Sequence, residues 1–338
     1  MAIGIAVAMG LVLPLLVFIY AAHLFLVVFA GLLLAVLLRA EADWLAGRTG
    51  VRPGFSLAAV ILFLVALLAA AGWTFSAQIS SQVDELARTA PQSYEAALDW
   101  LRQREWGRLL VGQLPEGDEL ELDRESMRAV TNVFSSAVSL VSSVLLLLFV
   151  GVYVAAEPDK YRRGFLHLLP LRSRDRANEL LGHVAHALRW WLLAQFVSMS
   201  YLAVSVTILL WALDVPLALT LGLMVGLFTF VPYLGPILGY IPIALVSFSD
   251  DPTKGLLATG IYLLIQSSEG YFVTPMIQRK AVSLPPALTL TSEFLAAVFL
   301  GILGFILATP LLVVVMVTVQ RLYVTWLGDD TFIQREAE

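Results

Sequence analysis

The sequence predicts an all-α, polytopic transmembrane helical protein with broken or hairpin helices and an outward-facing amphipathic helical segment. Of its 338 residues, 59% are hydrophobic and 14% are charged, whereas soluble domains carry about 25% charged residues. The mean hydropathy is +0.84, and several apolar runs reach the ~20 residues that cross a bilayer as a helix. In addition, prolines and glycines interrupt the apolar stretch 216–248, which holds no charged residue.

Composition also restricts the chemistry that the chain can perform. The formal net charge of −5 argues against a nucleic-acid partner, and the lack of cysteine excludes disulfides and thiolate chemistry. The common hydrolase, P-loop and dinucleotide motifs are absent, so we expect no enzyme, no cofactor and no ATP-driven transport by this chain alone. His183 and His186 could share a metal, but without a second pair of ligands nearby we interpret them as a solvated helix face and expect no metal.

The apolar segments predict three regions. Residues 1–75 should form N-terminal transmembrane helices, with two closely spaced helices at 3–19 and 23–38 and a third at 55–75. Residues 76–129 should form an extracytoplasmic amphipathic helical segment, whose apolar stripe has two interpretations, packing within the fold or contact between subunits. Residues 130–338 should form the transport core, with a cytoplasmic amphipathic helix at 173–189 and apolar segments at 130–156, 190–213, 216–248, 256–277 and 286–327.

Loop charges predict the orientation of these segments. The loop 157–189 carries seven lysines and arginines against four acids, whereas 76–129 carries six arginines against eleven acids. Because basic loops remain in the cytoplasm, we expect 157–189 and both termini inside and 76–129 outside. To keep Asp250 and Asp251 outside, 216–248 must enter and leave from the outer face as a hairpin. Likewise 286–305 must return to the inner face, either as two crossings or as a re-entrant hairpin.

The stretch 230–242 predicts a break at membrane depth, since it contains Pro232, Pro236, Pro242, Gly235 and Gly239. A proline in a helix interior removes a hydrogen bond at a cost of roughly 3 kcal/mol in water. No water satisfies the freed carbonyl in hydrocarbon, so broken backbone persists only inside protein or beside a wet cavity. The stretch therefore indicates a pathway for a polar species. Thr229, Tyr233 and Tyr240 could donate hydrogen bonds to that species, and the alternative for the two tyrosines is an anchor at the membrane surface.

Two further sequence features bear on this pathway. Gly222 and Gly226 match the small-xxx-small pattern of closely packed helices. A second interrupted region, 286–327, contains Gly301, Gly304 and Pro310, and paired discontinuous helices are typical of secondary transporters.

Two carboxyl groups lie inside apolar segments, where ionisable groups are costly and are candidates for function. Glu269 follows Gln266, Ser267 and Ser268, and it could exchange a proton, bind a cation, or make a structural hydrogen bond to a broken helix. Glu293 lies in the last apolar region and has the same alternatives, with a position near the outer interface or a hairpin tip as its structural interpretation.

An ordered set of motifs resembles the autoinducer-2 exporter family. The stretch 229–239 resembles its Pro-Tyr-x-Gly-Pro-x-x-Gly signature, and Glu269-Gly270 followed by Thr274-Pro275 resembles its Glu-Gly and Thr-Pro steps. Leu284-Pro285-Pro286, the block 299–310 and Gln195 fit in order, although Ala194 replaces a glycine and Glu293 stands where a small or apolar residue is expected. The resemblance implies a polytopic fold and either export of autoinducer-2 or sodium/proton antiport.

These observations lead to one hypothesis and its alternatives. The first is a secondary transporter of the bacterial inner membrane that exports a small polar metabolite by alternating access, coupled to protons through Glu269. The alternatives are a sodium/proton antiporter and a passive channel or membrane scaffold. The expected partners are the lipid bilayer, the polar substrate or a monovalent cation and proton, and further copies of the chain in a homo-oligomer. The expected pathway residues are Gln195, Thr229, Pro232, Tyr233, Gly235, Pro236, Gly239, Gln266, Glu269, Thr274, Pro275, Glu293, Gly301 and Gly304.

Overall fold

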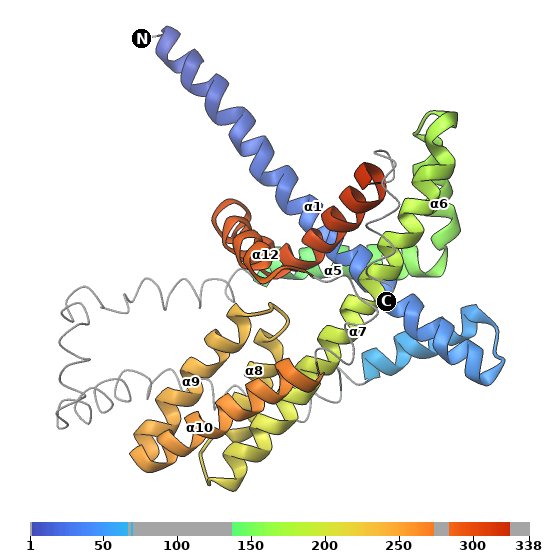
Figure 1. The fold of residues 1–338 in the computed structure, drawn as a ribbon. Helices are drawn as coiled ribbons and strands as arrows, with labels where there is room; N and C mark the ends of the chain where they lie inside the picture. Colours follow the sequence, from blue (N-terminus) through green and yellow to red (C-terminus); the bar gives the residue numbers. More distant parts are fainter. Residues whose placement is uncertain (1, 67–68, 70–136, 274–283, 325–338) are drawn as a thin grey trace. The chain divides into compact units, whose positions relative to one another are not determined.

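The structure is a computed structural model that describes residues 2–66, 69, 137–273 and 284–324 (Figure 1). These residues form helices and turns with no strand, which confirms the all-α prediction. Three helical stretches in this part of the chain are long and apolar enough by length and composition to cross a membrane, Ala21–Thr49, Leu171–Ala212 and Pro286–Leu322, although the last of them is interrupted at Gly301. The predicted outer segment 76–129 lies outside the described residues.

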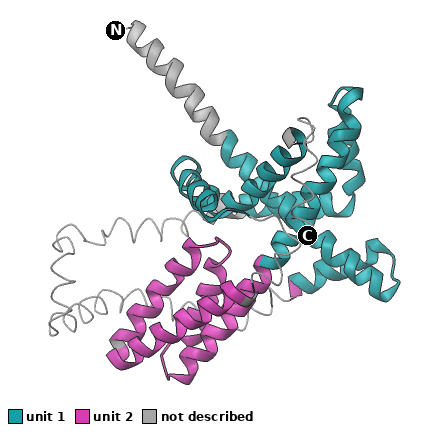
Figure 2. Ribbon diagram, in the orientation of Figure 1, with its two compact units in different colours: residues 1–64, 143–194, 277–338 teal, residues 65–142, 195–276 magenta. Residues whose placement is uncertain are grey.

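The chain divides into two compact units (Figure 2). Unit 1 comprises residues 1–64, 143–194 and 277–338, and unit 2 comprises residues 65–142 and 195–276. Residues that are distant in the sequence are therefore brought together within each unit.

Unit 1 begins with α1, a continuous α-helix over Ala2–Thr49. The prediction of two helices at 3–19 and 23–38 was wrong, because the residues between them include no proline or glycine to end the helix. A shorter apolar helix, Pro53–Ala66, and α5, Ala137–Ala156, follow.

The helices α1 and α5 pack closely at two glycines. A Cβ at Gly31 of α1 would lie 2.8 Å from Val150 Cβ, and one at Gly151 would lie 2.7 Å from Leu34 Cδ2. These glycines therefore let α1 and α5 approach closely.

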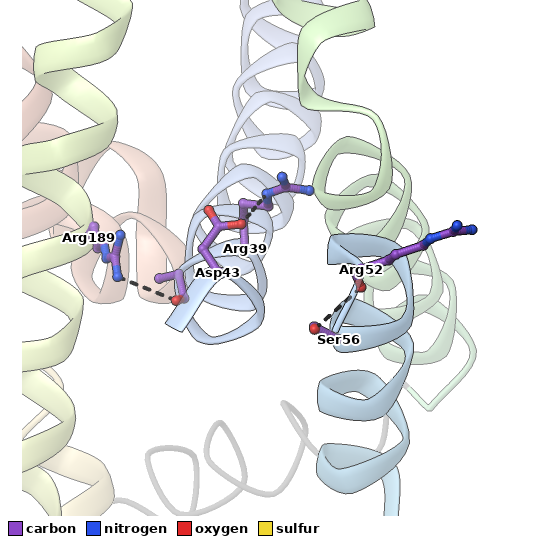
Figure 3. Close-up of polar contacts among 6 residues, drawn as sticks. Arg39, Asp43, Arg52, Ser56 and Arg189 are labelled. Carbon is purple, nitrogen blue, oxygen red and sulfur yellow. Dashed lines mark hydrogen bonds and ion pairs between the residues drawn. The ribbon is translucent and has the colours of Figure 1, made fainter. Parts of the chain in front are cut away.

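The basic region continues as α6 (Pro158–His167), η1 (Leu171–Ser173) and α7 (Arg174–Ala212). The predicted amphipathic helix 173–189 and the span 190–213 were treated as separate, but both lie in α7, which contains no proline. At 1.5 Å per residue, its 39 residues extend over about 58 Å, nearly twice the ~30 Å hydrocarbon core. Arg189 of α7 donates a hydrogen bond to the Ala40 carbonyl of α1 at 3.4 Å (Figure 3).

The helix α12, Pro286–Val319, is folded back on itself at Gly301, where φ is 67° and ψ is −157°. Thr309 Oγ1 donates to Glu293 Oε1 at 3.0 Å across 16 residues, which a straight helix would separate by about 24 Å. A Cβ at Gly304 would also lie 2.6 Å from the Ala296 carbonyl oxygen. The predicted hairpin is thus confirmed, with arms at 286–300 and 302–319 followed by the π-helix η3, Gln320–Val324.

Of the three residues that mark the interrupted region 286–327 in the sequence, Gly301 forms the turn, whereas Pro310 is buried inside the helical second arm. The first arm would extend over only about 22 Å, less than the ~30 Å hydrocarbon core. Its length therefore favours a re-entrant hairpin over two full crossings.

Replacing Gly301 with alanine should lower the thermal stability of the purified protein. A side chain is strained at this backbone conformation, with a cost of about 1–3 kcal/mol. No atom lies within 4 Å of the added Cβ, so the cost comes from the backbone alone. Gly260→Ala, in the helix α10 (Pro252–Ser268), is the matched control, since its Cβ also meets nothing within 4 Å and φ is not positive. Equal melting temperatures of the two variants in detergent would contradict the assignment of the turn.

Unit 2 consists of the second half of α7 with α8 (Ala218–Phe228), α9 (Leu234–Asp250), α10 (Pro252–Ser268) and the π-helix η2 (Glu269–Val273). Its core joins all four α-helices through buried residues that include Leu202, Val206, Leu210, Leu221, Val225, Ile243, Ala258 and Tyr262. A Cβ at Gly222 would lie 2.8 Å from the Ala203 carbonyl oxygen, and one at Gly226 would lie 2.6 Å from Ala203 Cβ. The prediction that these glycines allow close helix packing is confirmed.

Candidate functional site

The helix break in unit 2 is shorter than the sequence predicts, because α8 ends at Phe228 and α9 begins at Leu234. Pro232 lies in the break, whereas Pro236 lies in the first turn of α9, where a backbone N–H has no partner in the helix. Pro242 lies inside α9, which continues past it. The predicted break at 230–242 is therefore corrected to 229–233.

The turn between α8 and α9 depends on the absence of a side chain at Gly235. The Phe228 carbonyl oxygen occupies the position that a Cβ on Gly235 would take. A Cβ on Gly239 would lie 3.0 Å from Val225 Cα, so α9 also runs close along α8. Tyr233, the residue before α9, has φ 60° and a half-exposed side chain. The segment is a hairpin of two helices, as the sequence predicts.

Gln195 of α7 binds the backbone at this break. Its side-chain Nε2 donates to the Thr229 carbonyl oxygen, and both residues are buried. Thr229 Oγ1 donates in turn to the Val225 carbonyl oxygen at 2.7 Å. Carbonyls freed at a helix end require donors when water is excluded, and Gln195 supplies one to the Thr229 carbonyl oxygen.

Glu269 lies where α10 changes from an α-helix to the π-helix η2. Its side chain is 9% exposed, and Ser198 Oγ donates to its Oε1 at 2.5 Å. Gln195 and Ser198 are three residues apart and lie on the same face of α7. This face therefore contacts both the helix break and the Glu269 carboxyl group. Single π-helical turns are frequent at functional sites.

Further polar contacts connect the helices around this carboxyl group. The Tyr201 hydroxyl lies 2.5 Å from Ser268 Oγ, and the Tyr262 hydroxyl donates to the Pro236 carbonyl oxygen at 2.8 Å. The rings of Tyr240 and Tyr262 lie 5.0 Å apart between α9 and α10. Gln266 Oε1 is buried with no hydrogen-bond partner among the described residues. We call Gln195, Ser198, Tyr201, Thr229, Ser268 and Glu269 the α7 polar cluster.

The predicted pathway residues are divided between the two units. Gln195, Thr229 and Glu269 belong to the α7 polar cluster, while Pro232, Tyr233, Gly235, Pro236, Gly239 and Gln266 lie in the surrounding parts of unit 2. Glu293, Gly301 and Gly304 belong to unit 1, in the α12 hairpin. Thr274 and Pro275 lie outside the described residues.

Sequence reasoning missed Ser198 and Tyr201. Their spacing from Gln195 places them along one side of the mostly apolar second half of α7, and this pattern could have drawn attention to them.

The α7 polar cluster presents oxygen atoms from a carboxyl group, hydroxyl groups and backbone carbonyls within a largely apolar unit. Such an arrangement can hold a proton on the carboxyl group, coordinate a small cation, or donate hydrogen bonds to a polar molecule. Within the described residues, no group of three histidine, aspartate or glutamate side chains is placed to hold a metal ion.

The sequence is similar to known transport proteins. Residues 7–323 match the family model described as "AI-2E family transporter". The protein TqsA of Escherichia coli, named an AI-2 transport protein, is 25% identical over 258 residues, which cover 72% of each chain. A proposed transport protein from Alkalihalophilus pseudofirmus is 23% identical over 330 residues, which cover 90% of this chain and 84% of the relative.

A third relative matches over a shorter length. YueF of Bacillus subtilis, also named as a proposed transport protein, is 25% identical over 190 residues, which cover 55% of this chain and 52% of YueF. A second protein of the same organism, YrrI, matches over 46% of its own length. The chain thus spans about half the length of these two curated relatives.

Proposed function

This chain belongs to the AI-2E family of transporters, and we propose that it is a secondary transporter that exports a small polar metabolite by alternating access. In this proposal the driving force is a proton gradient, and Glu269 carries the coupling proton. The observation that supports it most strongly is the position of the Glu269 carboxyl group. The α7 face that contacts Glu269 through Ser198 also contacts the helix break through Gln195.

This position suggests how a proton and a substrate would be coupled. In this proposal the Glu269 carboxyl group is protonated in the state in which it accepts the hydrogen bond from Ser198. Release of that proton places a negative charge in an apolar unit, which is unfavourable unless donors or a cation approach. Because Gln195 holds the Thr229 carbonyl one helical turn away, a change at Glu269 can alter the contacts of the break. The proton would then enter from one side of the membrane while the substrate leaves toward the other.

The proposed substrate class is a small, polar, uncharged or weakly charged metabolite of the autoinducer-2 type. The relative TqsA is named an AI-2 transport protein, which supports this class. The hydroxyl groups of Tyr201 and Tyr262 and the amide of Gln266 suit hydrogen bonds to such a molecule. The buried and unpaired Gln266 Oε1 adds an acceptor that a hydroxyl-bearing substrate would satisfy.

Sodium/proton antiport is the second candidate. It is favoured by the oxygen atoms of the α7 polar cluster, since carboxylate and hydroxyl oxygens are ligands for small hard cations. In either case we place the protein in a bacterial inner membrane as a homo-oligomer, with both termini in the cytoplasm. The basic loop 157–189 supports this orientation.

Reconstitution of the purified protein in sealed vesicles distinguishes these functions. We expect an imposed proton gradient to drive movement of an autoinducer-2-type metabolite, with no effect on radioactive sodium. Gradient-driven movement of sodium alone would identify an antiporter instead. Metabolite movement that does not respond to the gradient would indicate a passive channel, and no movement of either solute would indicate a scaffold.

A further inference from the structure

The α12 hairpin of unit 1 encloses a second carboxyl group. Glu293, on the first arm, is 0% exposed, and Thr309, on the second arm, is 2% exposed. Thr309 Oγ1 donates to Glu293 Oε1 at 3.0 Å, so this hydrogen bond connects the two arms. Thr289, one turn before Glu293, is also buried. The carboxyl group therefore lies inside the folded hairpin and not on its surface.

The second oxygen of this carboxyl group has no partner. Glu293 Oε2 is buried and accepts no hydrogen bond from any described residue. A structural role in joining the arms needs only one acceptor, and Oε1 provides it. An ionised carboxyl group would leave a buried charge on Oε2 without compensation, which is strongly unfavourable. A proton on Oε2 removes that charge and leaves the Thr309 hydrogen bond intact.

The charged groups around the hairpin do not provide that compensation. In unit 1, α12 packs against α1 and continues into η3. On α1, Arg39 is paired with Asp43 at 3.0 Å, and the Arg48 guanidinium carbon lies 4.5 Å from the centroid of the Trp44 ring. The other acidic, basic and histidine residues of these two elements are His23, Glu41 and Arg321. Among the described residues, Glu293 makes its polar contact with Thr309 and forms no ion pair.

We infer that Glu293 is a proton-binding site of the α12 hairpin, with the proton on Oε2 and the Thr309 hydrogen bond on Oε1. This site goes beyond the proposed function, because it lies in unit 1, whereas Glu269 lies in unit 2. Loss of the proton would place a charge between the two arms and weaken their packing at Gly301. The chain would then carry two buried groups that can exchange protons, one in each unit.

Infrared spectroscopy of the purified full-length protein in lipid detects this proton directly, because a protonated carboxyl group has a carbonyl band that a carboxylate and an amide lack. We expect the wild-type protein to retain such a band at about pH 6, where exposed carboxyl groups are ionised. Glu293→Gln should remove the Glu293 component of that band, and Glu269→Gln should leave this component in place. The readout does not depend on transport, so its failure and the failure of the proposed function are distinguishable.

Two conservative variants test the geometry should Glu293→Gln fail to fold. Thr309→Val removes the donor to Oε1 and should shift the band to higher wavenumber, whereas Thr309→Ser keeps the donor and should leave the band unchanged. The inference is overturned if the Glu293→Gln spectrum equals that of the wild type. It is also overturned if the two Thr309 variants give the same band, or if sodium removes the band at constant pH.

Discussion

Replacing Glu269 with glutamine should abolish the response of substrate accumulation to a proton gradient. Glutamine keeps the size of the side chain and an acceptor for Ser198, but it cannot release a proton. A difference of one pH unit corresponds to about 1.4 kcal/mol, so each coupled proton supports a concentration ratio of about tenfold. We expect this ratio, measured in sealed vesicles at equal protein content, to fall to about one in the variant.

Matched serine variants show whether the effect belongs to the α7 polar cluster. Ser198→Ala removes the donor to Glu269 Oε1 and should reduce the gradient-driven rate. Ser267→Ala, on the adjacent α10, should leave it unchanged, because Ser267 is exposed and its hydroxyl donates to the Leu263 carbonyl of its own helix. If the Glu269→Gln variant still supports a tenfold concentration ratio of the substrate, another group carries the proton.

Replacing Gly235 with alanine should destabilise unit 2 more than any other single methyl addition at the break. The new methyl group would occupy the position of the Phe228 carbonyl oxygen. A backbone atom cannot rotate away as a side chain can, so the α8–α9 turn would have to open. Overpacking in a core costs typically 1–3 kcal/mol. We expect the free energy of unfolding of the Gly235→Ala variant to fall by an amount at or above the upper end of that range.

The melting temperature and the size-exclusion profile in detergent measure this loss. Gly270→Ala is the control, because its Cβ would meet no atom within 4 Å. We expect the control to behave as the wild type in both assays, while Gly235→Ala melts at a lower temperature or fails to give a single peak. Equal stability of the two variants would mean that α8 and α9 do not approach at Gly235 as described.

The broad architecture was predictable from composition and loop charge, since both are averages over many residues. The charge pattern required two hairpins, at 216–248 and 286–305, and the structure contains a hairpin in each region. The family resemblance was likewise carried by motifs that can be read directly from the chain. Features that depend on the sum of many residues can therefore be predicted from the sequence before the fold is known.

The positions of the turns were less predictable, because proline and glycine have different effects in different contexts. Pro242 and Pro310 lie inside helices that continue past them, and Pro236 lies in a first turn where its missing N–H has no consequence. Gly301 has a positive φ, whereas Gly304 lies three residues further on within the helical second arm. Local sequence alone does not distinguish these cases, since the packing of the surrounding helices decides them.

The contacts of the α7 polar cluster were the least predictable part of the site. Glu269 stood out as a carboxyl group in an apolar segment, but its donor Ser198 is 71 residues away in the sequence. The long helix α7 was divided in the prediction at the point where its charge changes, although its backbone has no break there. Gln195 and Ser198 lie just beyond that point, so their common face was not recognised.

The most direct measurement of the central proposal is the initial rate of metabolite movement in wild-type vesicles under proton gradients of opposite sense. Because a coupled transporter exchanges proton for substrate, we expect net movement in opposite directions under the two gradients and none when the gradient is collapsed. Movement at one rate under both gradients and in their absence would contradict proton coupling through Glu269 and would identify a passive pathway.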